Sequence, residues 1–368
     1  MRAEGGEWMR KSRDTGMREC GNDNGSGRVG SRVRTLADLP LSVLDLASVY
    51  EGMTHAEAIA QTIETAKVAD DLGYERFWVA EHHGMPAVAS SAPAVLIGAI
   101  ADATTRIRVG SGGVMLPNHS SLVIAEQFGT LVALHGDRID LGLGRAPGTD
   151  QLTASILRRN LGSEAVDDFP SQVIELLAFF GSIDPLENGL GAQPAAHPGL
   201  GDSPEMWLLG SSGFSARLAG LLGLPFAFAH HFAGGDNTPA AFQLYRESFV
   251  PSTVLAEPHS MVAVAALVAD SQADADRLAL PNGLYFSRLR SGARPGRIPT
   301  LAEAEAHDWT VEELDFVRTR NAQQAVGDLD RARLRIEFIA ESTGADEVIV
   351  VPQGPDLATK LRTLRDLR

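Results

Sequence analysis

The sequence predicts an α/β protein with the fold of a (β/α)8 barrel, also called a TIM barrel. Eight short apolar runs alternate with stretches in which apolar residues recur at helical spacing, the pattern of buried parallel strands joined by helices. Residues 37–368 exceed the roughly 250 residues that such a barrel needs. We therefore expect one barrel domain over 37–368. Residues 1–36, rich in Gly, Arg, Ser and Asn, are expected to form a disordered tail.

The first half of the barrel is predicted as four strand–helix pairs. The first helix begins at the capping residue Thr54 and stops at Gly73, and the second begins with Pro93, which suits a first helical turn. The third helix is closed by Gly136. The expected strands are Leu41–Ala47, Phe77–Glu81, Ile107–Val114 and Ile139–Gly144, and the helices after them are 54–73, Pro93–Ala103, Leu122–Leu134 and Gln172–Phe180.

The second half repeats the alternation with two long connections. Its expected strands are Met206–Leu209, Pro225–Ala229, Met261–Ala269 and Glu347–Val351, followed by helices Phe214–Leu222, Pro239–Phe249, Gln272–Leu280 and Leu357–Leu367. The segments Ala146–Pro204 and 281–328 are too long for ordinary barrel loops. The second lies between strands seven and eight, so it emerges on the carboxyl side of the barrel. It is interpreted either as a lid or as a disordered surface insertion.

Composition narrows the classes of partner. A hydrophobic content of 44% with 21% charged residues is typical of a soluble globular enzyme. The net charge of −15 repels nucleic acid and anionic membranes, so we expect neither as a partner. No apolar run approaches the length of a membrane span, and the single cysteine, Cys20, fits a reducing compartment. We expect a cytoplasmic protein.

Reactive side chains follow several of the predicted strands. Glu81-His82-His83, Gly110–Gly113, Arg145 and Gly210-Ser211-Ser212 each come directly after an apolar run, whereas the opposite strand ends are expected to lack such groups. In parallel barrels the chemistry collects at the carboxyl ends of the strands. This asymmetry predicts an active site at that end.

Two histidine pairs, His82-His83 and His230-His231, invite a metal interpretation. Neighbours on a strand point to opposite faces, so each pair sends at most one ring inward, and the sequence has no His-x-His or His-Glu-x-x-His pattern. We therefore expect no metal. A histidine at a strand end can instead act as a general acid or base, or be a hydrogen-bonded residue of the barrel rim.

The run Gly210-Ser211-Ser212-Gly213 enters a helix and predicts an anion site suited to phosphate, because helix N-termini present free N–H groups. Arg145 could reach the same phosphate. The alternatives are a plain serine cap and a salt bridge from Arg145 to Asp137, Asp140 or Asp150. Gly112 and Gly113 either let a flat ligand lie against the backbone or relieve a tight barrel core.

Taken together, five segments resemble the bacterial-luciferase-like flavin monooxygenases. The resemblance covers roughly 39–368 and is carried, in the family's order, by 77–83, 110–117, 125–127, 141–145 and 223–225. It implies a (β/α)8 barrel that holds reduced FMN, or a deazaflavin in some branches, at the carboxyl end.

Individual positions follow from the resemblance. His82 is similar to the family's histidine that assists peroxyflavin chemistry, and Arg145, Ser212 and Ser215 match the positions that hold the flavin phosphate. Gly112-Gly113 matches a non-proline cis peptide beneath the flavin ring. Two positions depart from the light-emitting enzymes: Ser211 replaces an acidic residue, and His230 stands where an aromatic flavin neighbour is found. Light emission is therefore not expected.

The function that the resemblance implies is a flavin-dependent monooxygenase. It would use O2 and reduced FMN, supplied by a separate flavin reductase, to oxidise a small organic substrate through a peroxyflavin, and it would form a homodimer. A deazaflavin-dependent oxidoreductase on the same fold is the first alternative. A non-catalytic flavin-binding protein would keep Arg145 and the serines without needing His82, and a metal-dependent hydrolase is the remote alternative.

Overall fold

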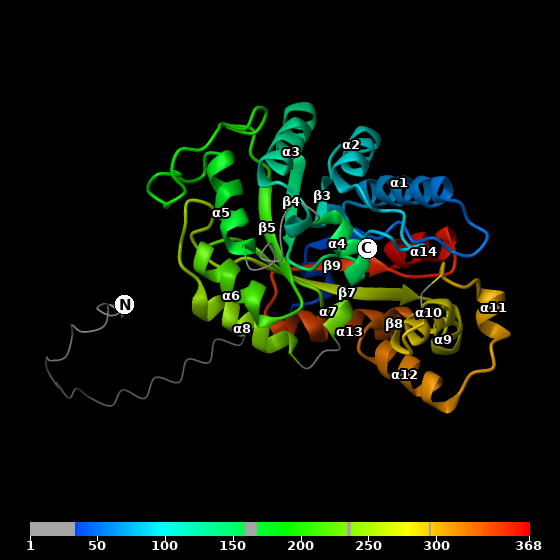
Figure 1. Cartoon of the computed structure of the whole chain (residues 1–368). Helices are drawn as coiled ribbons and strands as arrows, with labels where there is room; N and C mark the ends of the chain where they lie inside the picture. The colour runs from blue at the N-terminus through cyan, green and yellow to red at the C-terminus, as the bar shows by residue number, and fades with distance from the viewer. Residues whose placement is uncertain (1–33, 159–167, 234–236, 294–295) are drawn as a thin grey trace, which may run out of the picture. The chain divides into compact units, whose positions relative to one another are not determined.

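The computed structural model describes residues 34–158, 168–233, 237–293 and 296–368. Their strands form one parallel sheet in which β1 pairs with both β2 and β9, and β6 pairs with β7, so the sheet closes into a ring. The predicted barrel is confirmed (Figure 1). The ring consists of β1 (Leu41–Asp45), β2 (Arg76–Val79), β3 (Arg108–Met115), β4 (Ile139–Gly144), β5 (Glu205–Gly210), β6 (Phe226–Phe228), β7 (Ser260–Val268) and β9 (Glu347–Pro352).

A long helix lies between each pair of consecutive barrel strands, and one more follows the last strand. These helices are α1 (His55–Asp71), α2 (Pro93–Ala103), α3 (Ser121–His135), α5 (Phe169–Phe179), α6 (Gly213–Leu222), α8 (Thr238–Ser248), α13 (Leu329–Thr343) and α14 (Leu357–Leu367). Shorter helices α4 (Gln151–Leu157) and α7 (His230–Ala233) precede α5 and α8. The cap predicted at Thr54 is present, since its hydroxyl accepts the Glu57 N–H, and the Glu57 side chain completes a capping box.

The helix predicted after β7 at Gln272–Leu280 is present as α9 (Gln272–Leu278), but the helix that returns the chain to β9 is α13. The Asp328 side chain caps α13 by accepting the Arg331 N–H, and Gly344 ends it in the left-handed region. The segment 272–278 is α9, the start of an insertion that includes α10 (Leu280–Arg290), α11 (Leu301–Glu305), α12 (Val311–Ala322) and β8 (Ala325–Gly327).

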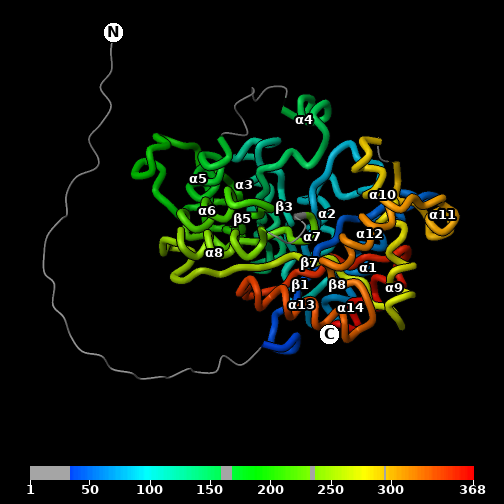
Figure 2. Tube along the Cα trace, turned by 90° about the horizontal axis from the view of Figure 1, so that it is seen from below, coloured from blue at the N-terminus to red at the C-terminus, as the bar shows by residue number. Residues whose placement is uncertain are grey.

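The insertion gathers at the carboxyl end of β7. Ala266 of β7 pairs with Pro352 of β9 and also with Ala325 of β8, so β8 lies on the edge of β7 opposite β9. Figure 1 shows α10, α11 and α12 beyond the arrowhead of β7, and Figure 2 shows the same three helices near one another. The insertion is therefore placed to contribute side chains to the mouth of the barrel.

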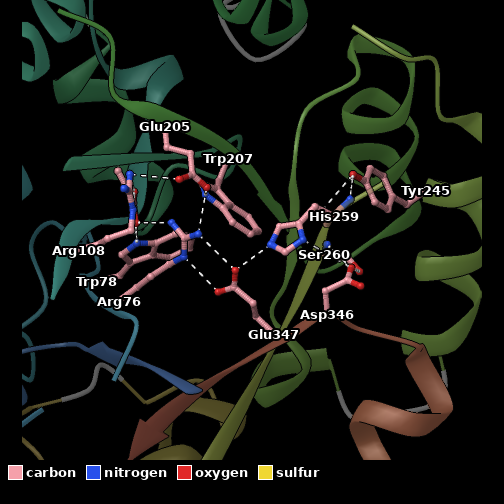
Figure 3. Close-up of polar contacts among 11 residues, drawn as sticks. Arg76, Trp78, Arg108, Glu205, Trp207, Tyr245, His259, Ser260, Asp346 and Glu347 are labelled. Carbon is pink, nitrogen blue, oxygen red and sulfur yellow. Dashed lines mark hydrogen bonds and ion pairs between the residues drawn. The ribbon is translucent and has the colours of Figure 1, made fainter. Parts of the chain in front are cut away.

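The amino ends of the strands carry a buried charge network, so the expectation that they lack reactive groups is wrong. Arg76 contacts Asp140 at 2.9 Å and both Glu205 and Glu347 at 3.1 Å (Figure 3). His259 donates to Glu347 at 2.8 Å, and this bond raises the pKa of His259. Trp78 and Trp207 pack edge-to-face at 5.5 Å between ring centroids and donate from Nε1 to Asp140 and Glu205 of this network. Charge and aromatic rings thus close this end of the barrel.

The expected tail falls almost wholly outside the described residues. Its last residues, Arg34–Leu36, contact the barrel domain: Arg34 donates to the Ala345 carbonyl and the Leu36 N–H donates to Glu337, both at 2.7 Å. Across the described ranges, no helix has the length and apolar character needed to cross a membrane.

Candidate active site

One cavity lies at the carboxyl ends of the strands, and every strand of the ring contributes to its wall. It has a volume of about 210 Å³. Of the predicted site residues, those that line it are His82, Gly112, Gly113, Arg145, Gly210, Ser211, Ser212 and Ser215. The structure therefore brings together, from β2, β3, β4 and β5, residues that are far apart in the sequence.

Arg145 and the start of helix α6 lie next to each other in the wall of the cavity. The Arg145 guanidinium stacks on Phe214 in the first turn of α6, at 4.0 Å from the ring centroid. Among the described residues Arg145 has no carboxylate partner, because Asp140 binds Arg76 and Arg108 while Asp150 caps α4. The alternative of a salt bridge from Arg145 to Asp137, Asp140 or Asp150 is therefore wrong for the described residues.

Serines at the start of α6 also line the cavity. Ser212 occupies the N-cap position of α6, but its side chain makes no capping hydrogen bond, unlike the expected plain serine cap. Ser215 is buried one turn later and packs on Gly210, where an added Cβ would lie 2.6 Å from the Ser215 Cβ. Glycine at 210 thus lets the buried hydroxyl approach β5. The exposed residues Ser211 and Ser212 line the same cavity, next to the helix start whose first N–H groups have no intrahelical partner.

Two glycines of β3 also line the cavity. The Gly112–Gly113 peptide is cis, as expected. A Cβ on Gly112 would lie 2.8 Å from Leu44 Cδ1, and one on Gly113 would lie 2.6 Å from the Gly142 carbonyl oxygen. Close packing of the barrel therefore requires both glycines, in agreement with the tight-core interpretation. They also leave this part of the cavity wall without side chains.

His82 and His83 face opposite sides, as strand alternation predicts. His82 lines the cavity, is partly buried, and its Nδ1 has no hydrogen-bond partner in the described structure. Burial lowers the pKa of His82, against the charge of Glu81, so the imidazole is neutral at pH 7 and able to accept a proton. His83 turns away and donates to Glu81 at 2.8 Å.

Glu81 is the centre of a cluster that the sequence reasoning missed. Its fully buried carboxylate accepts hydrogen bonds from His83 and His119, both at 2.8 Å, and from the Met115 N–H at 3.1 Å. These donors outweigh burial and lower its pKa to about 2. The cluster also has the composition and spacing of a possible metal site. Its distances are those of hydrogen bonds that join the ends of β2 and β3 next to His82.

His230 is not at the cavity, contrary to its expected place beside the flavin. Its ring is bonded at both nitrogens, through Nδ1 to the Thr238 hydroxyl at 2.9 Å and through Nε2 to the Gln323 carbonyl at 3.1 Å. The neighbouring His231 lines the cavity instead. Burial, followed by the nearby charge of Arg320, lowers the pKa of His231 to about 3. The chain turns into α7 at His230, so the position that the resemblance matched to a flavin neighbour lies in a helix and not in the strand.

Comparison with known proteins agrees with this architecture. The family model of the luciferase-like monooxygenases matches residues 40–347. An uncharacterised protein of Bacillus subtilis (strain 168) is 48% identical over 89% of this chain and 95% of its own length. A luciferase-like monooxygenase of Escherichia coli (strain K12) is 44% identical over 88% of this chain and 95% of its own.

Solved structures share the fold. The crystal structure of apo-MsnO8 superposes with a TM-score of 0.78 at 36% identity, covering 89% of this chain and 97% of that one. The oxygenating constituent of 3,6-diketocamphane monooxygenase from Pseudomonas putida, in complex with FMN, and an F420-dependent secondary alcohol dehydrogenase have TM-scores of 0.66 and 0.63. The monooxygenase is 20% identical and covers 89% of this chain and 96% of its own chain. The dehydrogenase is 14% identical and covers 90% of this chain and 99% of its own chain. At these identities the two structures show the fold alone. The chain belongs to the luciferase-like monooxygenase family.

Proposed function

We propose that this protein is a flavin-dependent monooxygenase that uses reduced FMN and O2 to oxidise a small organic substrate. The observation that supports it most is the set of groups that line one cavity. The set includes a cation without a carboxylate partner among the described residues and a helix start without a side-chain cap. It also includes two glycines that leave the wall bare and a neutral histidine. Together these groups suit a phosphate, a flat ring system and a reacting centre.

Each group has a role in this proposal. The Arg145 guanidinium, the Ser212 and Ser215 hydroxyls and the first N–H groups of α6 would hold the phosphate. The wall at Gly112 and Gly113 would lie against the ring system. A reduced flavin supplies the electrons that activate O2, one atom of which enters the substrate while the other leaves as water.

His82 would accept and return a proton at the reacting centre, since its ring is neutral and its Nδ1 has no other partner in the described structure. The apolar lining from Leu44, Trp78, Leu209 and Phe228 would exclude water from that centre. We expect a separate reductase to supply the reduced flavin and a homodimer as the working form.

A binding titration tests the cofactor. FMN should bind more tightly than riboflavin, and Arg145→Met should remove most of that difference. Loss of one charged hydrogen bond of 1.5–3 kcal/mol corresponds to about a 10- to 100-fold weaker affinity for FMN. Arg217→Met is the matched control, because Arg217 lies exposed on α6 away from the cavity. Equal FMN affinity of Arg145→Met and the control would contradict the phosphate assignment.

Activity is tested with 18O2. Reduced FMN and a panel of aldehydes, ketones and thioethers should give a product that carries one 18O atom, detected by mass spectrometry. Binding of a deazaflavin in place of FMN, with hydride transfer and no 18O in the product, would favour the deazaflavin-dependent oxidoreductase. Flavin binding without any turnover across the panel would favour a binding protein.

A further inference from the structure

A second cavity adjoins the first and is built partly by the insertion. Leu44, Leu46, His231 and Phe232 line both cavities, so the two are adjacent. The walls of the second are completed by Tyr50 after β1, by Asn282, Tyr285 and Phe286 of α10, by Arg320 of α12 and by Lys360 of α14. The proposed function uses none of these groups.

Arg320 brings a positive charge to this cavity that no described carboxylate balances. Its guanidinium lies over the Phe286 ring, 4.0 Å from the centroid, and makes no ion pair within the described ranges. Burial lowers its pKa to about 10, which leaves it charged at neutral pH. The second cation, Lys360, is already paired with Asp45 at 3.6 Å. The cavity therefore has a net positive charge in a chain whose net charge is −15.

Tyr285 adds a hydroxyl donor. Its oxygen is buried and has no hydrogen-bond partner among the described residues, and burial raises its pKa, so the proton stays on the oxygen. The other polar groups are already engaged: Tyr50 donates to the Gly354 carbonyl and Asn282 to Gln353. A buried donor left without a partner costs stability, and a ligand that accepts its hydrogen bond removes that cost.

We propose that this second cavity binds the anionic group, a carboxylate or sulfonate, of the substrate. The Arg320 guanidinium binds it through two N–H donors and Tyr285 donates a third hydrogen bond. The apolar part of the substrate then runs past His231 and Phe232 into the first cavity, toward His82. The substrate class is thus a small organic acid with an apolar chain. This inference rests on the proposed function for the reaction, but not for the binding.

Calorimetric titration tests the binding, with straight-chain acids from acetate to decanoate, the matching sulfonates and the matching uncharged amides as probes. Wild-type protein should bind at least one acid about tenfold or more tightly than its amide. Arg320→Met should remove that preference and Tyr285→Phe should reduce it. Arg318→Met, an equal charge change at an exposed position of the same helix, should retain it. No preference for acid over amide at any chain length would overturn the proposal, as would an unchanged preference in Arg320→Met.

A second readout separates ligand binding from a structural role. Because Arg320 is an unpaired, partly buried cation, Arg320→Met should unfold at the same or a higher temperature than wild type. A lower unfolding temperature together with retained acid binding would mean that Arg320 only supports the fold.

FMN supplies the other anion that Arg320 could hold. If Arg320→Met loses the preference for FMN over riboflavin, Arg320 serves the cofactor phosphate and the proposal is wrong. If wild type binds no flavin at all, the proposed function fails while the acid titration still decides the role of Arg320.

Discussion

Replacement of Arg76 by Met tests whether the amino-end network holds the barrel closed. The side chain is 9% exposed and contacts three carboxylates within 3.1 Å, of which Asp140 is fully buried and Glu347 is 7% exposed. Removal of one member of a buried ion cluster typically costs about 3–5 kcal/mol, because the remaining charge stays buried without its partner. Here Arg108 still reaches Asp140 at 2.6 Å and His259 still donates to Glu347. We therefore expect the lower figure, about 3 kcal/mol.

Urea unfolding at pH 7 and at pH 4 measures the effect. Burial would raise the pKa of Glu347, but the His259 hydrogen bond and the charge of Arg76 outweigh it and lower that pKa. A lowered native pKa gives stability that is present above the ordinary value and lost as pH falls. The gap between wild type and Arg76→Met should therefore be full at pH 7 and smaller at pH 4. Arg362→Met, which breaks an exposed pair with Asp270, should change little. A loss below about 1 kcal/mol at pH 7 would refute the reasoning.

Three further predictions concern the carboxyl end. Glu81→Gln should lower the free energy of unfolding at pH 7 by about 3 kcal/mol, because the pKa of Glu81 is about 2 in the native state and ordinarily 4.5. This contribution is complete above pH 5 and declines as the pH falls to 2. Unfolding at pH 3, 5 and 7 measures it. His82→Ala should keep FMN affinity but release H2O2 in place of oxidised product, whereas His83→Ala should mainly lose stability; the ratio of product to H2O2 separates them, and an unchanged ratio in His82→Ala would make His82 structural. Gly210→Ala should push Ser215 aside and weaken FMN binding by about tenfold, measured by titration.

The barrel could be predicted because its signal is local. Buried parallel strands are apolar on both faces, so β1 to β7 and β9 appear as short apolar runs in the sequence. The strand-end residues could be predicted for the same reason: once a strand is placed, the next residues lie at the mouth. Arg145 and Ser212 required no knowledge of distant contacts.

Other features depend on contacts that no local pattern carries. Asp328 and Gly344 mark the ends of α13, but no local pattern shows that α13, and not the segment directly after β7, returns the chain to β9. His231 lines the first cavity and His230 does not, because the chain turns into α7 here and the strand pattern ends. The second cavity exists because α10 and α12 fold back over the mouth, and helix faces of an insertion cannot be oriented from periodicity alone.

The arginines at the two ends of the barrel differ in whether carboxylates of the protein pair with them. At the amino end, Arg76 and Arg108 are surrounded by carboxylates within 3.1 Å, so the positive charges are neutralised by the protein itself and a ligand would gain little there. At the carboxyl end, neither Arg145 nor Arg320 has a carboxylate partner in the described part of the chain, and each stacks on an aromatic ring at 4.0 Å. A cation kept in place by a ring and left without a counter-charge has its hydrogen-bond donors available. A partly buried cation costs stability unless an anion completes it. We therefore propose that the two unpaired arginines mark two anion positions in adjacent cavities, one for the phosphate of the cofactor and one for the acid group of the substrate.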